Sequence, residues 1–203
     1  MSTFRRRLMM TQTQGQGRLP TAYQEVEYIE CQGDGAYINT DIKGDVSITT
    51  SLDGCFTSTA TGTKVFLGLG TSAGNWIGQY NRKYAVGTTS AFTTSISSSE
   101  RKTLIATFDS NGCSLTVDNE TVSREGTHSA SNYFNIFFSG TTYTPSARVY
   151  EASIYQLSDN TLIRHFIPCY RKADSEIGLY DLVTNTFFNN NSSSGTFLKG
   201  NDV

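Results

Sequence analysis

The feature that most constrains the fold of this chain is a two-residue alternation of apolar and polar side chains between closely spaced turn signals. Every second residue from Val46 to Leu52 follows this pattern. Because successive side chains of a β-strand point to opposite faces, the alternation predicts a strand with one buried face. The Asn111-Gly112 pair separates two strand-like runs, 102–109 and 113–117, and supplies the positive φ values that a tight hairpin needs. Repeated short strands of this kind predict an all-β sandwich or barrel.

The remaining strand candidates are short and are flanked by Gly, Asn, Asp or Ser. Twelve Phe and 11 Tyr make the apolar content largely aromatic, which suits strands better than helices. No stretch has the pattern of a long amphipathic helix. The candidates are residues 24–29, 36–39, 65–69, 76–80, 120–122, 133–138, 148–157, 162–167, 177–180 and 187–188.

The composition changes only once along the chain, near its beginning. Residues 11–17, with the sequence TQTQGQG, are polar, glycine-interrupted and without periodicity, as expected of a linker. From Leu19 and Pro20 onward no second break occurs. The sequence therefore predicts a basic arm and linker at 1–18 and one β-sandwich domain at 19–203, a length that suits a single sandwich.

Net charge and hydropathy exclude several classes of partner. A formal charge of −2 provides no long-range attraction for nucleic acid or for acidic membranes. No apolar run approaches the roughly 20 residues of a membrane span. The arm begins like a signal peptide, but its apolar run is only Leu8–Met10, and no small-residue cleavage site follows. We expect a protein made in a cytoplasm and, if released, released by lysis.

The four cysteines give no sign of a metal site. Cys31, Cys55, Cys113 and Cys169 are widely spaced and form no Cys-x-x-Cys pair, so zinc is not expected. Two disulfides would allow three connectivities, which the sequence does not rank. We expect free thiols packed as small apolar side chains.

The two ends of the body resemble a known module. Residues 19–30 (LPTAYQEVEYIE) and 35–40 (GAYINT) resemble an opening found in proteins of gut bacteria and their phages. The C-terminal part of the body resembles the end of the same module. The matching segments are Ile154-Tyr155, 164–171 (RHFIPCYR), 176–181 (EIGLYD), Phe187-Phe188 and 195–197 (GTF). These proteins look like concanavalin A-like lectin/glucanase (laminin-G-like) domains. The resemblance implies an antiparallel jelly-roll β-sandwich with a phage-structural or adhesive role, and it identifies no ligand.

The resemblance extends to the arm, which looks like the start of phage or prophage structural proteins. It implies a non-catalytic virion protein of the head, tail-fibre or decoration type, made in the host cytoplasm. Its partners would be other virion proteins, host-surface glycans and, in a homo-oligomer, further copies of the chain. A bacterial surface adhesin is the alternative, which the missing signal peptide disfavours. Arginines and adaptable apolar side chains suit the arm to docking on a partner: Phe4, Arg5, Arg6, Arg7, Leu8, Met9 and Met10.

The strongest enzymatic candidate is a string of three glutamates, Glu25, Glu27 and Glu30. Laminarinase-like glucanases of the resembled fold use Glu-x-Asp-x-x-Glu, with a nucleophile and an acid about 5–5.5 Å apart. Here the middle residue is Glu, and the string lies on the first strand. The competing interpretation is a plain strand with Glu25 and Glu27 in solvent and Val26 and Tyr28 facing the core. We expect no catalysis, and keep a glycoside hydrolase as the alternative.

The best candidate for ligand binding is the segment 75–84 (NWIGQYNRKY). It combines Trp76, Tyr80 and Tyr84 with Arg82 and several amides. Aromatic faces stack on sugar rings, while amides and guanidinium groups give directional hydrogen bonds. Trp76 and Tyr80 share strand parity, so core packing is the favoured alternative for Trp76. Residues 81–83 suit an exposed hairpin tip.

The remaining candidates are ordinary structural residues. His128 lies in a polar loop and His165 in a strand, and neither accompanies a nucleophile motif. No phosphate-binding glycine loop is present, so no cofactor is expected. A calcium site would need converging oxygens. Turn formation is the commoner role for the aspartates that are candidates: Asp34, Asp41, Asp45 and Asp53.

Overall fold

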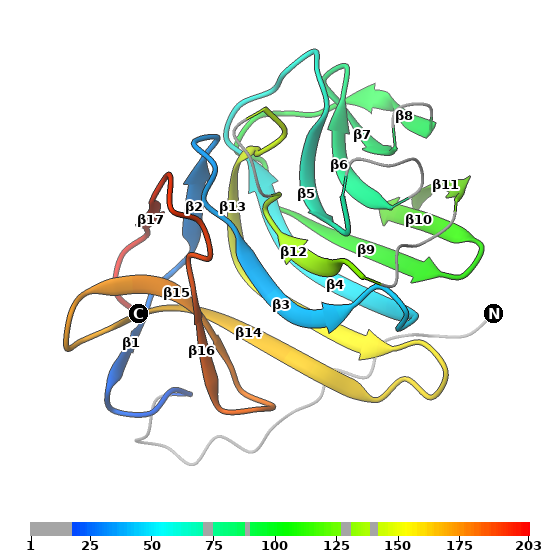
Figure 1. The fold of residues 1–203 in the computed structure, drawn as a ribbon. Coiled ribbons are helices and arrows are strands. Elements are labelled where there is room, and N and C mark those ends of the chain that lie inside the picture. The colour runs from blue at the N-terminus through cyan, green and yellow to red at the C-terminus, as the bar shows by residue number, and fades with distance from the viewer. Residues whose placement is uncertain (1–17, 71–74, 88–89, 127–130, 139–141) are drawn as a thin grey trace.

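The computed structural model describes residues 18–70, 75–87, 90–126, 131–138 and 142–203. The chain forms two antiparallel sheets whose inner faces pack against each other (Figure 1). Within the described ranges there are strands and turns but no helix. The all-β sandwich predicted from the sequence is therefore confirmed.

The larger sheet has eleven strands. Its main path runs β11-β10-β9-β4-β13-β14-β15-β16, while β1 pairs with β14, and β2 pairs with both β13 and β17. The strands are β1 (Tyr23–Glu25), β2 (Ile29–Gln32), β4 (Ile48–Phe56), β9 (Lys102–Asp109), β10 (Gly112–Val117), β11 (Glu120–Glu125), β13 (Ser146–Gln156), β14 (Leu162–Arg171), β15 (Glu176–Asp181), β16 (Thr186–Asn189) and β17 (Phe197–Lys199).

The smaller sheet has six strands in the order β3-β12-β5-β6-β7-β8 and lies across the larger one (Figure 1). Its first strand, β3, forms one edge, and β8 forms the other. The strands are β3 (Ile38–Lys43), β5 (Lys64–Gly68), β6 (Trp76–Tyr80), β7 (Lys83–Val86), β8 (Ser90–Ser95) and β12 (Tyr133–Ile136).

The core between the sheets follows from strand alternation. In β4, Ile48 and Leu52 are completely buried, while Ser51 between them is partly exposed. Aromatic side chains fill the gap between the sheets, with Phe56 and Phe66 ring centroids 5.1 Å apart. Burying each such side chain contributes about 1.5–3 kcal/mol. The aromatic, strand-compatible composition thus supplies the core directly.

Two tight hairpins show the turn chemistry of the sequence. Asp118 and Asn119, between β10 and β11, have φ of 49° and 72°. Asn81 and Arg82, between β6 and β7, have φ of 50° and 61°. Paired positive φ values at the two central residues match the right-handed twist of hairpin strands. These turns fix the register of the strands on either side.

The hairpin expected at Asn111-Gly112 is present, but its turn is held differently. Only Gly112 of this pair has positive φ, at 147°. Asp109 Oδ1 accepts hydrogen bonds from the backbone N–H of Asn111 (2.7 Å) and of Gly112 (3.1 Å). An aspartate side chain therefore caps the turn.

The larger sheet forks where β13 changes partner. The first half of β13 pairs with β2, from Ser146↔Gln32 to Val149↔Ile29, and the second half pairs with β14. β1 pairs instead with the far end of β14. The strand predicted at 24–29 is therefore wrong as one element: it consists of β1 and the start of β2, and the chain crosses the fork between them.

Candidate functional site

A polar pocket of about 460 Å³ lies at the fork of the larger sheet. A bulge between Val149 and Glu151, relative to β4, helps to form it. Bulges commonly re-aim side chains next to functional sites. Here Tyr150 and Glu151 both line the pocket, opposite the segment that crosses the fork. The lining residues are Arg18, Glu25, Val26, Glu27, Tyr28, Arg101, Tyr150, Glu151 and Val203.

The carboxylates of this fork pocket are joined by basic side chains. Arg18 forms an ion pair with Glu25 and lies 3.3 Å from Glu151 Oε2 through Nη1. His165 Nε2 lies 2.8 Å from Glu151 Oε1. The hydrogen bond to His165 is the main cause that lowers the pKa of Glu151, and it outweighs partial burial, which raises it. Glu151 is therefore held in its ionised form.

Arginine–tyrosine stacking continues the same surface. Arg148 donates from Nε to Glu30 Oε2 at 2.7 Å, and its guanidinium carbon lies 4.3 Å from the ring centroid of Tyr28. Tyr28 meets the ring of Tyr150 edge-on at 5.5 Å, and Arg101 lies 4.2 Å from the Tyr150 centroid. Each arginine covers the face of a tyrosine. The ring faces that a ligand would need are thus partly occupied by the protein itself.

The three glutamates of the sequence motif do not share one cavity. Glu25 and Glu27 line the fork pocket, whereas Glu30 is paired with Arg148 outside its lining. Glu27 Oε2 accepts hydrogen bonds from both the backbone and the side-chain amide of Asn201, each at 3.2 Å. The motif therefore does not bring its three carboxyl groups around one cavity, as the glucanase arrangement would require.

The aromatic candidates from the 75–84 segment lie on two faces of the smaller sheet. Trp76 is completely buried with Val65 and Ala85 on the outer side of this sheet, and Tyr80 packs against that group. Tyr84 is 7% exposed and belongs to the core between the sheets. Arg82 is exposed at the turn. The structure therefore does not bring the four residues together, and the exposed part of the set is the hairpin tip.

Three buried polar atoms lie around Trp76. The indole Nε1 of Trp76, Oδ1 of Asn75 and Oδ1 of Asn135 have no hydrogen-bond partner in the described structure. Asn135 and Trp76 flank Gly68 on neighbouring strands. A Cβ at Gly68 would lie 2.6 Å from Trp76 Cβ, so only glycine fits this close to the start of β6. Buried polar atoms of this kind normally bind water.

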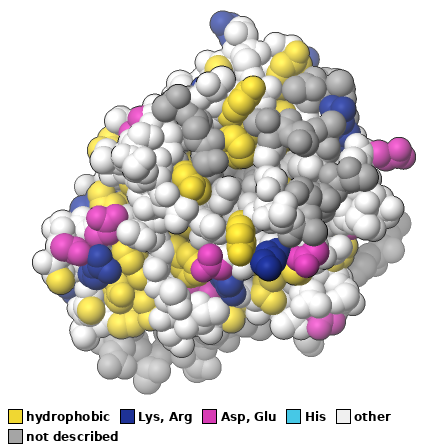
Figure 2. Space-filling view, viewed as in Figure 1, with side chains coloured by type: hydrophobic (Ala, Val, Ile, Leu, Met, Phe, Trp, Pro, Cys, Tyr) yellow, Lys and Arg dark blue, Asp and Glu magenta, His cyan; other side chains and the backbone are white. Residues whose placement is uncertain are grey.

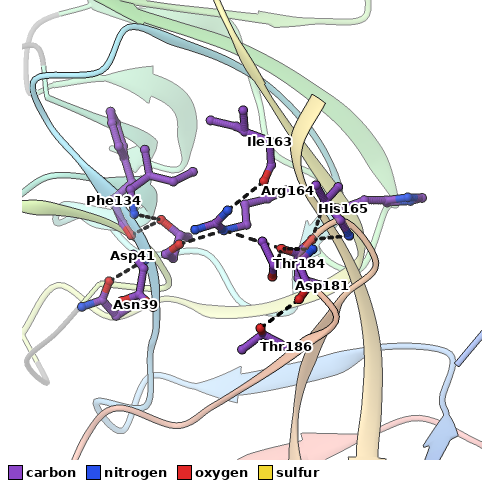
Figure 3. A network of polar contacts seen from close by, with 12 residues as sticks. Asn39, Asp41, Phe134, Ile163, Arg164, His165, Asp181, Thr184 and Thr186 are labelled. Atoms are coloured by element: carbon purple, nitrogen blue, oxygen red, sulfur yellow. Dashed lines mark hydrogen bonds and ion pairs between the residues drawn. The ribbon is translucent and has the colours of Figure 1, made fainter. Parts of the chain in front are cut away.

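A second polar network closes the edge of the sandwich between β14 and β3 (Figure 3). Its centre is Asp181, which is completely buried. The carboxylate accepts hydrogen bonds from the backbone of His165 (2.7 Å), the backbone of Val183 (3.1 Å) and the hydroxyl of Thr184 (2.6 Å). Asp181 thus holds the turn between β15 and β16 against β14.

Arg164 connects this network to the smaller sheet. Its Nε lies 3.6 Å from Asp181 Oδ2 and donates to the backbone oxygen of Thr40 on β3 at 3.2 Å. Its Nη1 donates to the oxygen of Ile163 at 2.8 Å (Figure 3). β3 is an edge strand, and a free strand edge is prone to unwanted pairing. Arg164 therefore covers part of an edge that would otherwise be open.

The aspartates considered for calcium are dispersed. Asp34 Oδ2 accepts a hydrogen bond from the backbone of Thr196 at 2.9 Å, and Asp53 forms a two-point ion pair with Arg101 at 2.8 and 2.5 Å. Asp41 and Asp45 lie near each other on another surface groove. In the part of the chain that the structure describes, no three His, Cys, Asp or Glu side chains are grouped to hold a metal ion.

The four cysteines are free and buried, as the sequence predicts. Burial raises the pKa of Cys31 and of Cys169 to about 12, and it raises the pKa of Cys113 well above its ordinary value. Thiols of this kind are largely unreactive near neutral pH.

Two sets of candidates lie outside the described residues: His128 and the arm residues Phe4–Met10. The first described residue, Arg18, attaches the beginning of the body to the fork pocket. In the described part of the chain no helix is long and apolar enough to cross a membrane.

Most residues of these networks carry no recognisable signal in the sequence. Glu151, Arg164 and Asp181 lie on β13, β14 and β15, and Arg101 directly precedes β9, so these residues meet only through sheet topology. The module-end motifs 164–171 and 176–181 contain Arg164 and Asp181, but nothing in the sequence pairs those two residues.

Comparisons with protein-family models, curated proteins and solved structures found no match.

Proposed function

We propose that this chain is a non-catalytic binding module, with a β-sandwich that presents its surface to a glycan or host-cell ligand. The proposal rests on one observation: the acidic side chains of the fork pocket are held by ion pairs and hydrogen bonds within the protein. Glu25 and Glu151 are bound by cationic side chains, and Glu27 by two amide donors of Asn201. An acid–base pair for hydrolysis would have to reach the substrate with these same carboxyl groups. The pocket favours a structural role for these acids.

The virion assignment rests on the resemblance of the sequence at 19–40, 154–197 and the arm. In this proposal the arm, Phe4–Met10, attaches the chain to the particle, and the sandwich is displayed outward. The contacts of Arg18 support these separate roles of arm and sandwich, because they hold the segment that follows the arm against the sandwich. A homo-oligomer is compatible with a displayed sandwich but is not required by it.

A glycoside hydrolase remains the second candidate, because the fork does gather Glu25 and Glu27 with Glu151 around one pocket. The ion pairs with Arg18 and the lowered pKa of Glu151 oppose it.

The binding proposal is tested with fluorescently labelled full-length protein on host-cell surfaces and on a glycan array. Saturable binding that survives heat-killing of the cells and is removed by periodate oxidation of surface sugars is the expected result. Binding that is unaffected by periodate would overturn the glycan part of the proposal. Absence of binding to cells and glycans would overturn the whole of it.

A further inference from the structure

A groove of about 500 Å³ lies beside the edge strand β3, next to Arg164. Its floor includes the half-buried apolar side chains Val46 and Ile163. Figure 2 shows acidic and basic side chains next to hydrophobic ones in the lower middle of the face turned to the viewer, where β3 lies in Figure 1. The volume is within the range of small-molecule sites in proteins, roughly 300–1,000 Å³.

The rim of this β3 groove carries charged side chains that form no ion pair with any described residue. Asp41, Lys43 and Asp45 are exposed and line the groove. Among the described residues none of their charged ends has a hydrogen-bond or ion-pair partner. The acids of the fork pocket, by contrast, are satisfied within the protein. The β3 groove therefore offers donors and acceptors that a ligand can use.

Arg164 adds a donor that is fixed in advance. Its Nε and Nη1 are held by Thr40 and Ile163, and its counter-ion Asp181 is completely buried behind it (Figure 3). The side chain is 17% exposed and lines the groove, so its guanidinium group is partly accessible there. A donor already held in place loses little conformational entropy on binding.

Tyr133 provides the apolar contact. It begins β12 beside Lys43 in the sheet register, lines the groove and is 37% exposed. A tyrosine ring offers a rigid apolar face together with a hydroxyl group. An exposed ring beside planar carboxylate and guanidinium groups suits a ligand with an apolar C–H face and adjacent hydroxyl groups.

The charges of the groove decide between neutral and anionic ligands. Asp41 and Asp45 balance Lys43 and Arg164, and the buried carboxylate of Asp181 adds one further negative charge behind the arginine. The groove thus has no excess positive charge with which to attract an anion. Hydroxyl groups, which both donate and accept hydrogen bonds, suit such a mixed lining better.

We propose that the β3 groove binds one uncharged pyranose ring of a glycan. The ring stacks on Tyr133, its hydroxyl groups donate to Asp41 and Asp45, and Arg164 donates to ring or hydroxyl oxygens. This inference rests on the proposed binding function, and it places the site at the edge of the sandwich instead of the 75–84 hairpin.

The test uses full-length protein on an array of neutral hexose- and N-acetylhexosamine-terminated glycans and of glycans that end in carboxylate-bearing sugars. Tyr133→Ala and Asp41→Asn should each weaken binding to the best neutral glycan about tenfold or more, as expected for loss of a stacked ring or a charge-assisted hydrogen bond. Tyr143→Ala is the matched control, since Tyr143 is 38% exposed and lies outside the groove lining. Tyr80→Ala tests the hairpin. Thermal melts check that each variant is folded.

The outcomes separate this inference from the broader function. If Tyr133→Ala and Asp41→Asn lose glycan binding while Tyr143→Ala and Tyr80→Ala bind as wild type does, the β3 groove is supported as the glycan site. Glycan binding that persists in both groove variants, or that requires Tyr80, overturns the assignment of the site to the β3 groove. The proposed binding function itself would then still stand. Binding only to carboxylate-bearing sugars overturns the neutral-ligand assignment. A wild-type protein that binds no glycan overturns the inference together with the glycan-binding function.

Discussion

Single residues set the polar architecture of this sandwich, and Asp181 is the clearest case. It is completely buried, yet it is surrounded by backbone and hydroxyl donors and by Arg164. A buried charge is tolerated only with such compensation. Its position at the end of β15 places three segments around one carboxylate, so its loss affects more than one contact.

Asp181→Asn is predicted to lower the free energy of unfolding by about 2 kcal/mol, because it removes the charge opposite Arg164 and leaves donors imperfectly paired. Urea denaturation at neutral pH measures the change. Asp174→Asn is the control, since Asp174 pairs with Arg171 on the surface and its loss should leave the unfolding midpoint unchanged. Equal effects of the two variants would contradict the role given to Asp181.

A second prediction at the scale of residues concerns the reactivity of the buried cysteines. Because burial raises the pKa of Cys31 and Cys169 to about 12, native protein at pH 7.5 should resist alkylation by iodoacetamide. After unfolding in urea all four thiols should react, as counted by intact-protein mass spectrometry. Rapid modification of any of the four in native protein would show that burial is less complete than described.

At the scale of elements, local sequence patterns predicted where the strands lie but not which strands pair in the sheets. Alternation identified β4 with its correct buried face, and Asn111-Gly112 identified the hairpin between β9 and β10. The fork was not predictable, because it depends on β13 exchanging β2 for β14, partners far away in the sequence. Tyr84 shows a register effect: Tyr80 pairs with Lys83, so Tyr84 points to the face opposite Tyr80.

The fork also makes the protein sensitive to acid. The pKa of Glu151 is lowered in the folded state, chiefly by His165, so its contribution to stability is present above the ordinary carboxyl pKa. That contribution is lost as the pH falls through the lowered value. Glu151→Gln should therefore be less stable than wild type at pH 7, with the difference narrowing between pH 5 and 3. Urea denaturation across this range tests the trend, and a difference that grew at low pH would contradict it.

At the scale of the whole molecule, the two sheets and their aromatic core were predictable, whereas the β3 groove was not. Composition and alternation require an all-β fold with one buried face per strand. The groove joins Tyr133 to Asp41 and Arg164, which lie on β12, β3 and β14 and become neighbours only in the folded chain. Sequence reasoning instead favoured the 75–84 segment, where aromatic residues are adjacent in the chain.

The proposed attachment of the arm to a phage particle can be tested by mutating its arginines. Full-length protein with Arg5, Arg6 and Arg7 all changed to Gln should fail to co-sediment with phage particles, because the proposed attachment depends on the charge of the arm. Its circular dichroism and thermal unfolding should match wild type. Normal incorporation of the triple variant would contradict the anchoring role.

Binding without catalysis can be checked by following one bound glycan over time with wild-type protein and with Glu27→Gln. Both proteins should bind with dissociation constants within about twofold of each other, since the Glu27 carboxylate accepts hydrogen bonds from Asn201 and lies outside the β3 groove. Mass spectrometry should show the glycan intact in both samples. Release of shorter sugars by wild type, together with accumulation of uncut glycan on Glu27→Gln, would contradict the account.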